Sequence, residues 1–270
     1  MSNASPAPIV ETRRLTRRYG ELCAVDEVTL SLNPGEAFGL LGRNGAGKTT
    51  VIKMLTTLLP PTSGSATVAG FDIVDSASSV RRAIGYVPQA LSADGDLTGY
   101  ENLLVFAKLY DIPRAGRSAR IRDALAFMEL AEFGDKLVKT YPGGMIRRLE
   151  IAQSTLHRPQ VLFLDEPTVG LDPIARTTVW DQVERLRAEY RSAILLTTHY
   201  LEEAERLCDR VAIMSRGRVT AIGTTRDLAA RVGPGATFED AFEHFTRDEA
   251  NSQGSYDETS QTRRTSQRLG

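Results

Sequence analysis

Cysteine is scarce in this chain, and its scarcity limits the chemistry that the chain can support. The 270 residues include two cysteines, Cys23 and Cys208, which lie far apart in the sequence. A disulfide framework or a cysteine-based zinc site needs more cysteines at short spacing, so we expect neither. The composition instead fits a protein that stays in a reducing compartment.

Long apolar runs and an excess of one sign of charge are missing as well. The apolar runs are short, such as Val161 to Leu164, whereas a membrane-spanning helix needs roughly 20 apolar residues. Residues 1–8 lack the basic start and apolar stretch of a secretion signal. With 33 basic and 34 acidic side chains the net charge is −1, which gives no electrostatic case for nucleic-acid binding. We therefore expect a cytoplasmic globular protein that reaches a membrane only through a partner.

Strand and helix patterns alternate along most of the chain. Val28, Leu30 and Leu32 alternate with polar residues, which is typical of a half-buried strand. Val161 to Leu164 is continuously apolar, as expected of a strand buried on both faces of a parallel sheet. Helical spacing dominates residues 98–158. The alternation predicts an α/β fold with a mostly parallel sheet, into which a smaller helical lobe is inserted.

The two ends of the chain differ from this predicted core. Residues 247–270 consist mainly of Ser, Thr, Gln, Arg and Glu and hold almost no large apolar side chains. Such a segment cannot bury enough surface to fold alone. We predict disorder over residues 1–8 and 247–270 and one folded domain over residues 9–246, with a helical subdomain at about residues 90–160.

A glycine-rich loop lies between the apolar strand that ends at Leu41 and a helix predicted from about Lys48 to Leu58. Backbone N–H groups in such a loop converge on phosphate oxygens, and the N-terminal end of the helix adds positive potential. Lys48 would supply a charge to the β- and γ-phosphates, and Thr49 would offer a hydroxyl to Mg²⁺. The alternative is a glycine-rich turn that holds Lys-Thr by chance, but its four fixed positions match in only about 1% of chains of this length. The predicted phosphate site comprises Gly42, Arg43, Asn44, Gly45, Ala46, Gly47, Lys48, Thr49 and Thr50.

Two carboxylates directly follow the buried strand that ends at Leu164. Asp165 and Glu166 are therefore expected at the edge of the sheet where nucleotides bind in open α/β folds. Asp165 suits Mg²⁺, directly or through water, and Glu166 suits polarisation of an attacking water. An isolated Asp-Glu-Pro is more often a solvated acidic turn, but a phosphate loop on an adjacent strand favours the catalytic interpretation. A lone histidine is usually structural or at the surface, but His199 ends another predicted strand at the same edge, where its imidazole could instead hydrogen-bond the γ-phosphate or the water.

The order of these motifs resembles that of the ATP-binding-cassette (ABC) family over roughly residues 9–245. Tyr19, in Arg18-Tyr19-Gly20, looks like the family's aromatic residue that stacks on adenine. Gln89 looks like its glutamine loop, which contacts Mg²⁺ and the attacking water and borders the membrane partner. Standing alone, Tyr19 would be interpreted as a core aromatic residue and Gln89 as a surface amide. His199 matches the family's switch histidine.

Two further loops carry the same resemblance. Pro142, Gly143 and Gly144 lie before a helix, where the family has its signature loop. Asp172, in Gly170-Leu171-Asp172, looks like the aspartate loop that contacts the second subunit. The family usually has serine where this chain has Pro142, which lacks both a hydroxyl and an N–H group. We predict that this loss removes about 1–3 kcal/mol of hydrogen bonding to the γ-phosphate and weakens ATP-driven pairing.

The resemblance implies a fold and a mechanism. The fold is a P-loop NTPase core with a mixed, mostly parallel sheet, an antiparallel β subdomain and an inserted α-helical subdomain. Two subunits pair head to tail, as a homodimer or as a heterodimer with another ABC subunit, and enclose ATP and Mg²⁺ between them. Lys48, Gln89, Glu166 and His199 carry the hydrolysis of ATP to ADP and phosphate. An integral membrane permease, on whose cytoplasmic face the chain sits, uses the resulting change of state.

Local patterns in this chain distinguish between several classes of ABC protein. The segment Phe238 to Phe245 resembles the C-terminal helix of export-type subunits, and Tyr141 to Asp172 resembles bacterial drug and antibiotic exporters. A ribosome-acting ABC protein normally has two cassettes, and a DNA-repair ABC protein has a long coiled-coil insertion that residues 98–158 are too short to form. A regulatory subunit without hydrolysis is disfavoured by the intact Lys48, Asp165 and Glu166. The sequence therefore predicts an exporter ATPase, with a soluble or regulatory ABC ATPase as the alternative.

Overall fold

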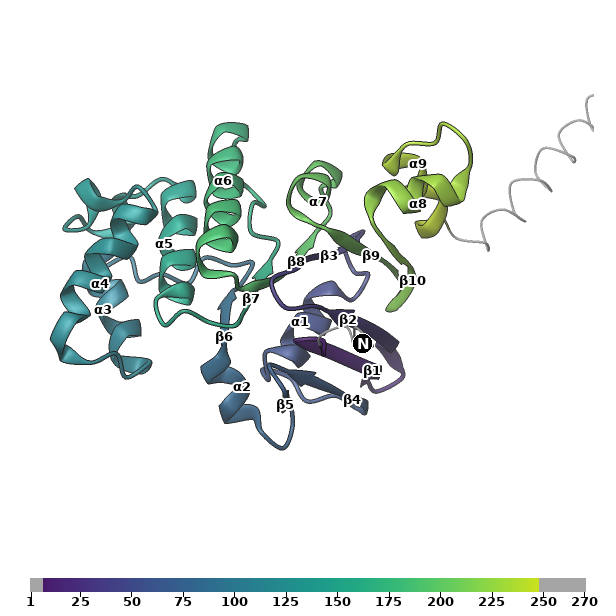
Figure 1. The fold of residues 1–270 in the computed structure, drawn as a ribbon, viewed down its shortest axis with the longest axis horizontal. Coiled ribbons are helices and arrows are strands. Elements are labelled where there is room, and N and C mark those ends of the chain that lie inside the picture. Colours follow the sequence, from purple (N-terminus) through teal and green to yellow (C-terminus); the bar gives the residue numbers. More distant parts are fainter. Residues whose placement is uncertain (1–6, 248–270) are drawn as a thin grey trace, which may run out of the picture.

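The computed structural model describes residues 7–247 and contains a six-stranded sheet at its centre (Figure 1). The strand order is β10-β9-β3-β8-β7-β6. Neighbouring strands from β9 to β6 are parallel, and β10 joins the edge of the sheet antiparallel to β9. The strands are β3 (Ala37–Gly42), β6 (Ile84–Val87), β7 (Val161–Asp165), β8 (Ala193–Thr198), β9 (Arg210–Ser215) and β10 (Arg218–Gly223).

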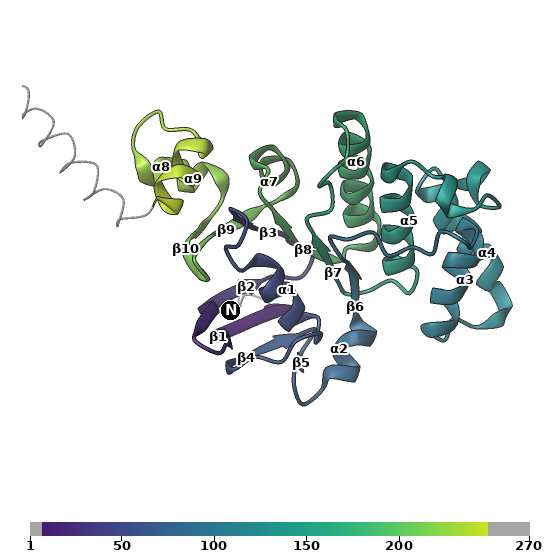
Figure 2. The ribbon, with the colours of Figure 1, turned by 180° about the vertical axis from the view of Figure 1, so that it is seen from behind.

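A second sheet of four antiparallel strands lies beside the first (Figure 2). Its order is β2-β1-β4-β5. The strands are β1 (Val10–Tyr19), β2 (Leu22–Leu32), β4 (Ser63–Val68) and β5 (Phe71–Asp72). The mixed, mostly parallel main sheet and the antiparallel subdomain confirm the predicted fold class.

The central strands are buried on both faces, which explains why their sequences are continuously apolar. Every residue of β3, β7 and β8 is buried. Because successive side chains point to opposite faces, Phe163 packs into the core shared with α1 (Lys48–Leu55) and the antiparallel sheet. Leu162 and Leu164 pack into the other core, with the helices that precede and follow β7. Each such side chain contributes about 1.5–3 kcal/mol by leaving water, so both faces anchor the strand ends that carry the site.

Helices connect β6 to β7 and form a lobe at one end of the main sheet (Figure 1). Thr98 and Glu101 form a capping box that begins the first of them. The helices are α3 (Gly99–Leu109), α4 (Arg114–Phe127), the 3-10 turns η1 (Ala131–Phe133) and η2 (Val138–Thr140), and α5 (Gly143–Thr155). The helical character predicted for residues 98–158 is therefore observed, while the limits of a separate subdomain at about residues 90–160 stay a prediction.

The remaining helices lie around the main sheet. They are α2 (Ala77–Ala83), α6 (Pro173–Tyr190), α7 (Leu201–Leu207), α8 (Thr225–Val232) and α9 (Phe238–Thr246). The last two, α8 and α9, pack against β9 and β10 at one edge of this sheet. In both views α5 and α6 lie side by side (Figure 2). Among the described residues, none of these helices is long and apolar enough to cross a bilayer. The disorder predicted for residues 1–8 and 247–270 falls almost wholly on residues 1–6 and 248–270, which lie outside the described part of the chain.

The helix after the glycine-rich loop is shorter than predicted. It ends at Leu55 instead of Leu58. Thr57 has φ 63°, its N–H group donates to Met54 O at 3.1 Å, and the Leu58 N–H group donates to Lys53 O at 2.9 Å. This pair of bonds is a Schellman motif, which usually has glycine at the left-handed position. A threonine at that position gave no sequence signal for the end of the helix.

Candidate functional site

The glycine-rich loop joins β3 to α1 and packs tightly against the rest of the chain. Gly47, the N-cap of α1, has φ 102°, and a side chain there would bring a Cβ to within 2.5 Å of Ala24 O. The Gly217 N–H group donates to Ala46 O at 3.0 Å, which fastens the loop to the turn between β9 and β10. Glycine is therefore required at Gly47 both by conformation and by space.

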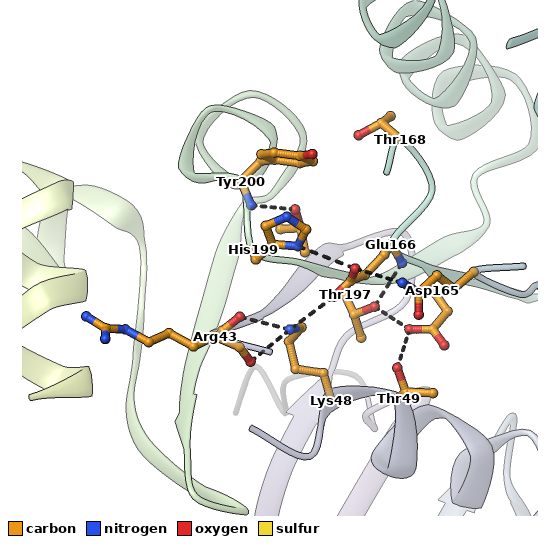
Figure 3. Close-up of polar contacts among 12 residues, drawn as sticks. Arg43, Lys48, Thr49, Asp165, Glu166, Thr168, Thr197, His199 and Tyr200 are labelled. Atoms are coloured by element: carbon orange, nitrogen blue, oxygen red, sulfur yellow. Dashed lines mark hydrogen bonds and ion pairs between the residues drawn. The ribbon is translucent and has the colours of Figure 1, made fainter. Parts of the chain in front are cut away.

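Lys48 begins α1 and is buried in the centre of the site. Its side chain is 4% exposed, and Nζ donates to Gly42 O at 2.8 Å and to Arg43 O at 3.3 Å. The same ammonium forms an ion pair with Glu166 Oε1 at 3.1 Å (Figure 3). A buried cation with three acceptors around it is held in one place, which suits recognition of an anionic ligand.

Asp165 ends β7 and faces the first turn of α1. Its Oδ1 accepts hydrogen bonds from the Thr49 hydroxyl at 3.0 Å and from the Thr197 hydroxyl at 2.6 Å (Figure 3). Its Oδ2 is buried and has no hydrogen-bond partner among the described residues. Burial and the negative charge of Asp165 raise the pKa of Tyr86 to about 12, so this tyrosine stays neutral. A free carboxylate oxygen beside a hydroxyl is a donor set that Mg²⁺ accepts.

Glu166 turns sharply away from the strand that precedes it. Its φ is 48°, an uncommon value for a residue other than glycine, and its N–H group is fixed by the carbonyl oxygen of Thr197 at 3.1 Å and by its hydroxyl at 3.0 Å. Gln89 Nε2 donates to Glu166 Oε2 at 3.3 Å, and His199 Nδ1 lies 3.4 Å from the same oxygen. The structure thus gathers the four residues predicted to be catalytic, Lys48, Gln89, Glu166 and His199, around one carboxylate.

Most of the loop and part of this cluster line a hollow of about 520 Å³, whereas Gly42, Arg43, Asp165 and His199 are not among its lining residues. Sequence reasoning identified most of its lining but missed the contributions of β2 and of the turn between β9 and β10. Tyr19 does not line the hollow; its ring is 47% exposed, and the Arg17 guanidinium lies 4.7 Å from the ring centroid. The lining residues are Leu22, Cys23, Ala24, Asn44, Gly45, Ala46, Gly47, Lys48, Thr49, Thr50, Gln89, Glu166, Arg216 and Gly217.

A second hollow, of about 370 Å³, contains the other predicted loops. Pro142, Gly143, Gly144 and Asp172 line it together, and it shares no lining residue with the first hollow. Pro142 is the N-cap of α5, and Gly143 and Gly144 are the first two residues of this helix. Within one chain, these four residues are therefore not brought to the glycine-rich loop.

A buried ion pair ties α5 to the segment that carries Gln89, and no sequence pattern had indicated it. Arg147 donates to Pro88 O at 2.6 Å and to Gln89 O at 2.7 Å, and it pairs with Glu150 at 3.0 Å. Glu150 in turn accepts from the backbone N–H group of Ser92 and from its hydroxyl. Both charged groups are almost completely buried, so the main-chain path around Gln89 depends on them.

Comparison with known proteins agrees with this arrangement. The family model described as ABC transporter matches residues 25–169. The chain belongs to the ABC transporter family. It is an ABC ATPase, the ATP-binding subunit of a transporter that works with a permease.

Several curated proteins to which this ABC ATPase is similar are resistance and export proteins of bacteria. The daunorubicin/doxorubicin resistance ATP-binding protein DrrA of Streptomyces peucetius is 44% identical over 86% of this chain and 70% of that protein. The linearmycin resistance ATP-binding protein LnrL of Bacillus subtilis is 38% identical over 83% of this chain and 72% of that protein. The Nod factor export ATP-binding protein I of Ralstonia nicotianae is 42% identical over 82% of this chain and 68% of that protein.

Solved structures agree with the fold of this ABC ATPase. An ATP-binding subunit of an ABC transporter superposes with a TM-score of 0.79 at 30% identity, covering 88% of this chain and all of that one. The cbiO1 subunit of the Clostridium perfringens cbiONQ transporter gives a TM-score of 0.77 at 26% identity, over 84% of this chain and 92% of that one.

Proposed function

We propose that this ABC ATPase binds Mg-ATP at the hollow around Lys48 and hydrolyses it with Glu166 as the group that activates water. The observation that carries the proposal is the convergence of Lys48, Gln89 and His199 on the carboxylate of Glu166. Thr49, Asp165 and Gln89 would hold Mg²⁺, which when bound neutralises charge on the phosphates. The loop amides and Lys48 would bind the triphosphate, and Glu166 would orient and deprotonate the attacking water.

The remaining predicted residues have supporting roles in this proposal. Tyr19 would stack on the adenine ring, because its ring is half-exposed at the end of β1 and braced by Arg17. His199 would hydrogen-bond the γ-phosphate, since its imidazole already faces Glu166. Arg43, Asn44 and Ala46 would contribute backbone contacts within the loop.

We also propose that two copies of this chain, or this chain and another ABC subunit, pair head to tail. The separation of the two hollows supports this arrangement. Pairing would place Pro142, Gly143, Gly144 and Asp172 of one subunit over the nucleotide of the other. The N-terminal end of α5 would then face the γ-phosphate with its positive dipole.

Two substitutions test the catalytic proposal separately for binding and for chemistry. Lys48→Ala should abolish nucleotide binding measured by equilibrium dialysis with Mg-ATP. Glu166→Gln should keep binding and lower kcat about 10²–10⁴-fold, the usual contribution of a general base. Equal turnover in wild type and Glu166→Gln would contradict the proposed role of Glu166 in activating water. Equal nucleotide binding in wild type and Lys48→Ala would contradict the proposed phosphate site.

For the cargo we propose export of a hydrophobic drug or antibiotic through a separate permease at the cytoplasmic face of the membrane. The support is that the chain is 38–44% identical in sequence to proteins named for resistance to daunorubicin, doxorubicin and linearmycin. Cells that express the wild-type chain with the permease from the neighbouring reading frame should accumulate less doxorubicin than cells with Lys48→Ala. Equal accumulation would point to another cargo, such as the Nod factor for which another matching export protein is named.

A further inference from the structure

A buried carboxylate on α7 has no part in the site described above. Glu203 is completely buried, and its Oε1 accepts hydrogen bonds from the Thr168 hydroxyl at 2.7 Å and from the Trp180 indole N–H at 2.8 Å. Its Oε2 has no hydrogen-bond partner among the described residues. The part of the chain that the structure describes also gives Glu203 no ion-pair partner. Burial raises the pKa of the nearby Cys208 thiol, and the negative charge of Glu203 raises it further.

Stability alone does not account for a glutamate in this place. A carboxylate that is removed from water and paired only with neutral donors is unfavourable, and an apolar side chain of the same length would avoid the loss. A buried polar group that keeps its donors does, however, specify one relative arrangement of the segments that supply them. The identity of these segments is therefore the informative feature.

The three residues of this cluster lie on two stretches of chain, one after β7 and the other after β8. Thr168 lies on the loop that runs from Glu166 to Asp172, and Figure 3 shows it above Glu166 on that loop. Glu203 lies on α7, which begins directly after His199 and Tyr200. Trp180 lies in the middle of α6, the helix that Asp172 caps. One oxygen atom thus joins the segment after β7 to the segment after β8.

We propose that Glu203 is a positioning residue that holds the Thr168–Asp172 loop and the His199 segment in fixed relation. Glu166 lies between these two segments. Its alignment therefore depends on the spacing of the two segments, which the Thr168–Glu203 hydrogen bond fixes. The bond also connects the subunit-facing aspartate loop to the imidazole that faces the reacting phosphate. This inference rests on the proposed function, because the roles of Glu166, His199 and Asp172 come from it.

The two hydrogen bonds to Glu203 make a matched pair of tests. Thr168→Val is nearly isosteric and removes only the bond to the loop, whereas Trp180→Phe removes the bond to α6 together with part of the indole ring, over which Arg206 lies. We expect Thr168→Val to lower kcat for ATP about tenfold or more, since small misplacement of a catalytic group has effects of this order. Trp180→Phe should keep kcat within about twofold while its melting temperature falls.

Changes at Glu203 itself supply the second arm of the experiment. Glu203→Met should lower kcat like Thr168→Val and leave the Kd for ATP unchanged. Glu203→Gln should keep most of the turnover, because its amide oxygen can accept both hydrogen bonds. The double variant Thr168→Val/Glu203→Met should be no slower than Glu203→Met, as expected when both changes break one interaction.

Three outcomes would overturn the inference. One is an equal fall in kcat for Thr168→Val and Trp180→Phe, and another is a fall in kcat that tracks melting temperature across the variants. If Glu203→Met does not fold, the comparison of Thr168→Val with Trp180→Phe decides alone.

The variant His199→Ala separates this inference from the proposed function. The third contradicting outcome is lost turnover in His199→Ala with normal turnover in Thr168→Val, which would contradict the positioning role only. Normal turnover in His199→Ala would contradict the proposed role of the histidine.

Discussion

At the scale of single residues, Pro142 is the position where the sequence predicts a departure from the usual serine of the family. It caps α5 without a side-chain hydrogen bond, and its carbonyl accepts from the N–H groups of Met145 and Ile146. Pro142→Ser adds a hydroxyl at the end of α5 that would face the γ-phosphate of a paired subunit. On a Glu166→Gln background, we expect ATP-dependent pairing to tighten about five- to a hundredfold, measured by sedimentation.

Serine at this position would also cap α5 and stabilise the fold by about 1 kcal/mol. Pro142→Ala is the control, because it removes the ring without adding a hydroxyl. Our interpretation of Pro142 fails if the alanine variant pairs as tightly as the serine variant, or if neither pairs more tightly than the parent.

His157 is a residue whose protonation should affect stability. Its ring stacks on Tyr110 with centroids 3.7 Å apart, and Nε2 donates to Ile84 O at 3.0 Å. Burial, which outweighs the favourable bond to Ile84, lowers the pKa of His157 to about 4. The unfolded chain therefore binds a proton below about pH 6.5 while the folded chain does not, and the free energy of unfolding falls as pH drops from 6.5 towards 4.

Between pH 7 and pH 5 we expect this histidine to account for a loss of about 1–2 kcal/mol, measured by urea unfolding. His157→Gln keeps a donor for Ile84 O and cannot titrate, so its stability should depend less on pH over that interval. An equal pH dependence in the two proteins would show that His157 is already solvated.

At the scale of elements, Asp172 has a structural role beside its proposed contact with a second subunit. Its Oδ1 accepts from the N–H groups of Ile174 at 3.0 Å and Ala175 at 2.9 Å, which caps α6. Asp172→Ala should lower the free energy of unfolding by about 0.5–2 kcal/mol, whereas Asp172→Asn keeps an acceptor and should lose only a few tenths. Urea unfolding without nucleotide measures both; equal losses would assign the effect to the charge at the helix end and not to the capping bonds.

Elements were predictable where one local pattern dominates. The continuous apolar run of β7 and the glycine spacing before α1 led to Lys48, Asp165 and Glu166, because both patterns follow from burial and from phosphate chemistry. The helices α2 and α8 were missed because they are short and bury few side chains, which leaves little helical periodicity in the sequence. Thr197 and Arg147 were missed for another reason: their partners lie on distant segments, and only the register of β8 beside β7 and the packing of α5 bring them together.

At the scale of the whole molecule, the two separate hollows predict that turnover depends on association. If hydrolysis needs a pair of identical chains, the rate per chain should rise with protein concentration and level off once pairing is complete. Steady-state phosphate release over about a hundredfold range of concentration, with sedimentation at each point, measures this dependence. A constant rate per chain in samples that sediment as monomers would contradict the proposed pairing.

The placement of the two hollows on one chain also determines how damaged copies would combine. In a head-to-tail pair of a Lys48→Ala chain with a chain altered at Gly144, one interface receives both defects and the other receives neither. Two inactive proteins, once mixed, would then regain one intact interface between them. Two copies of the same damaged chain would carry one defect at each interface and would regain none.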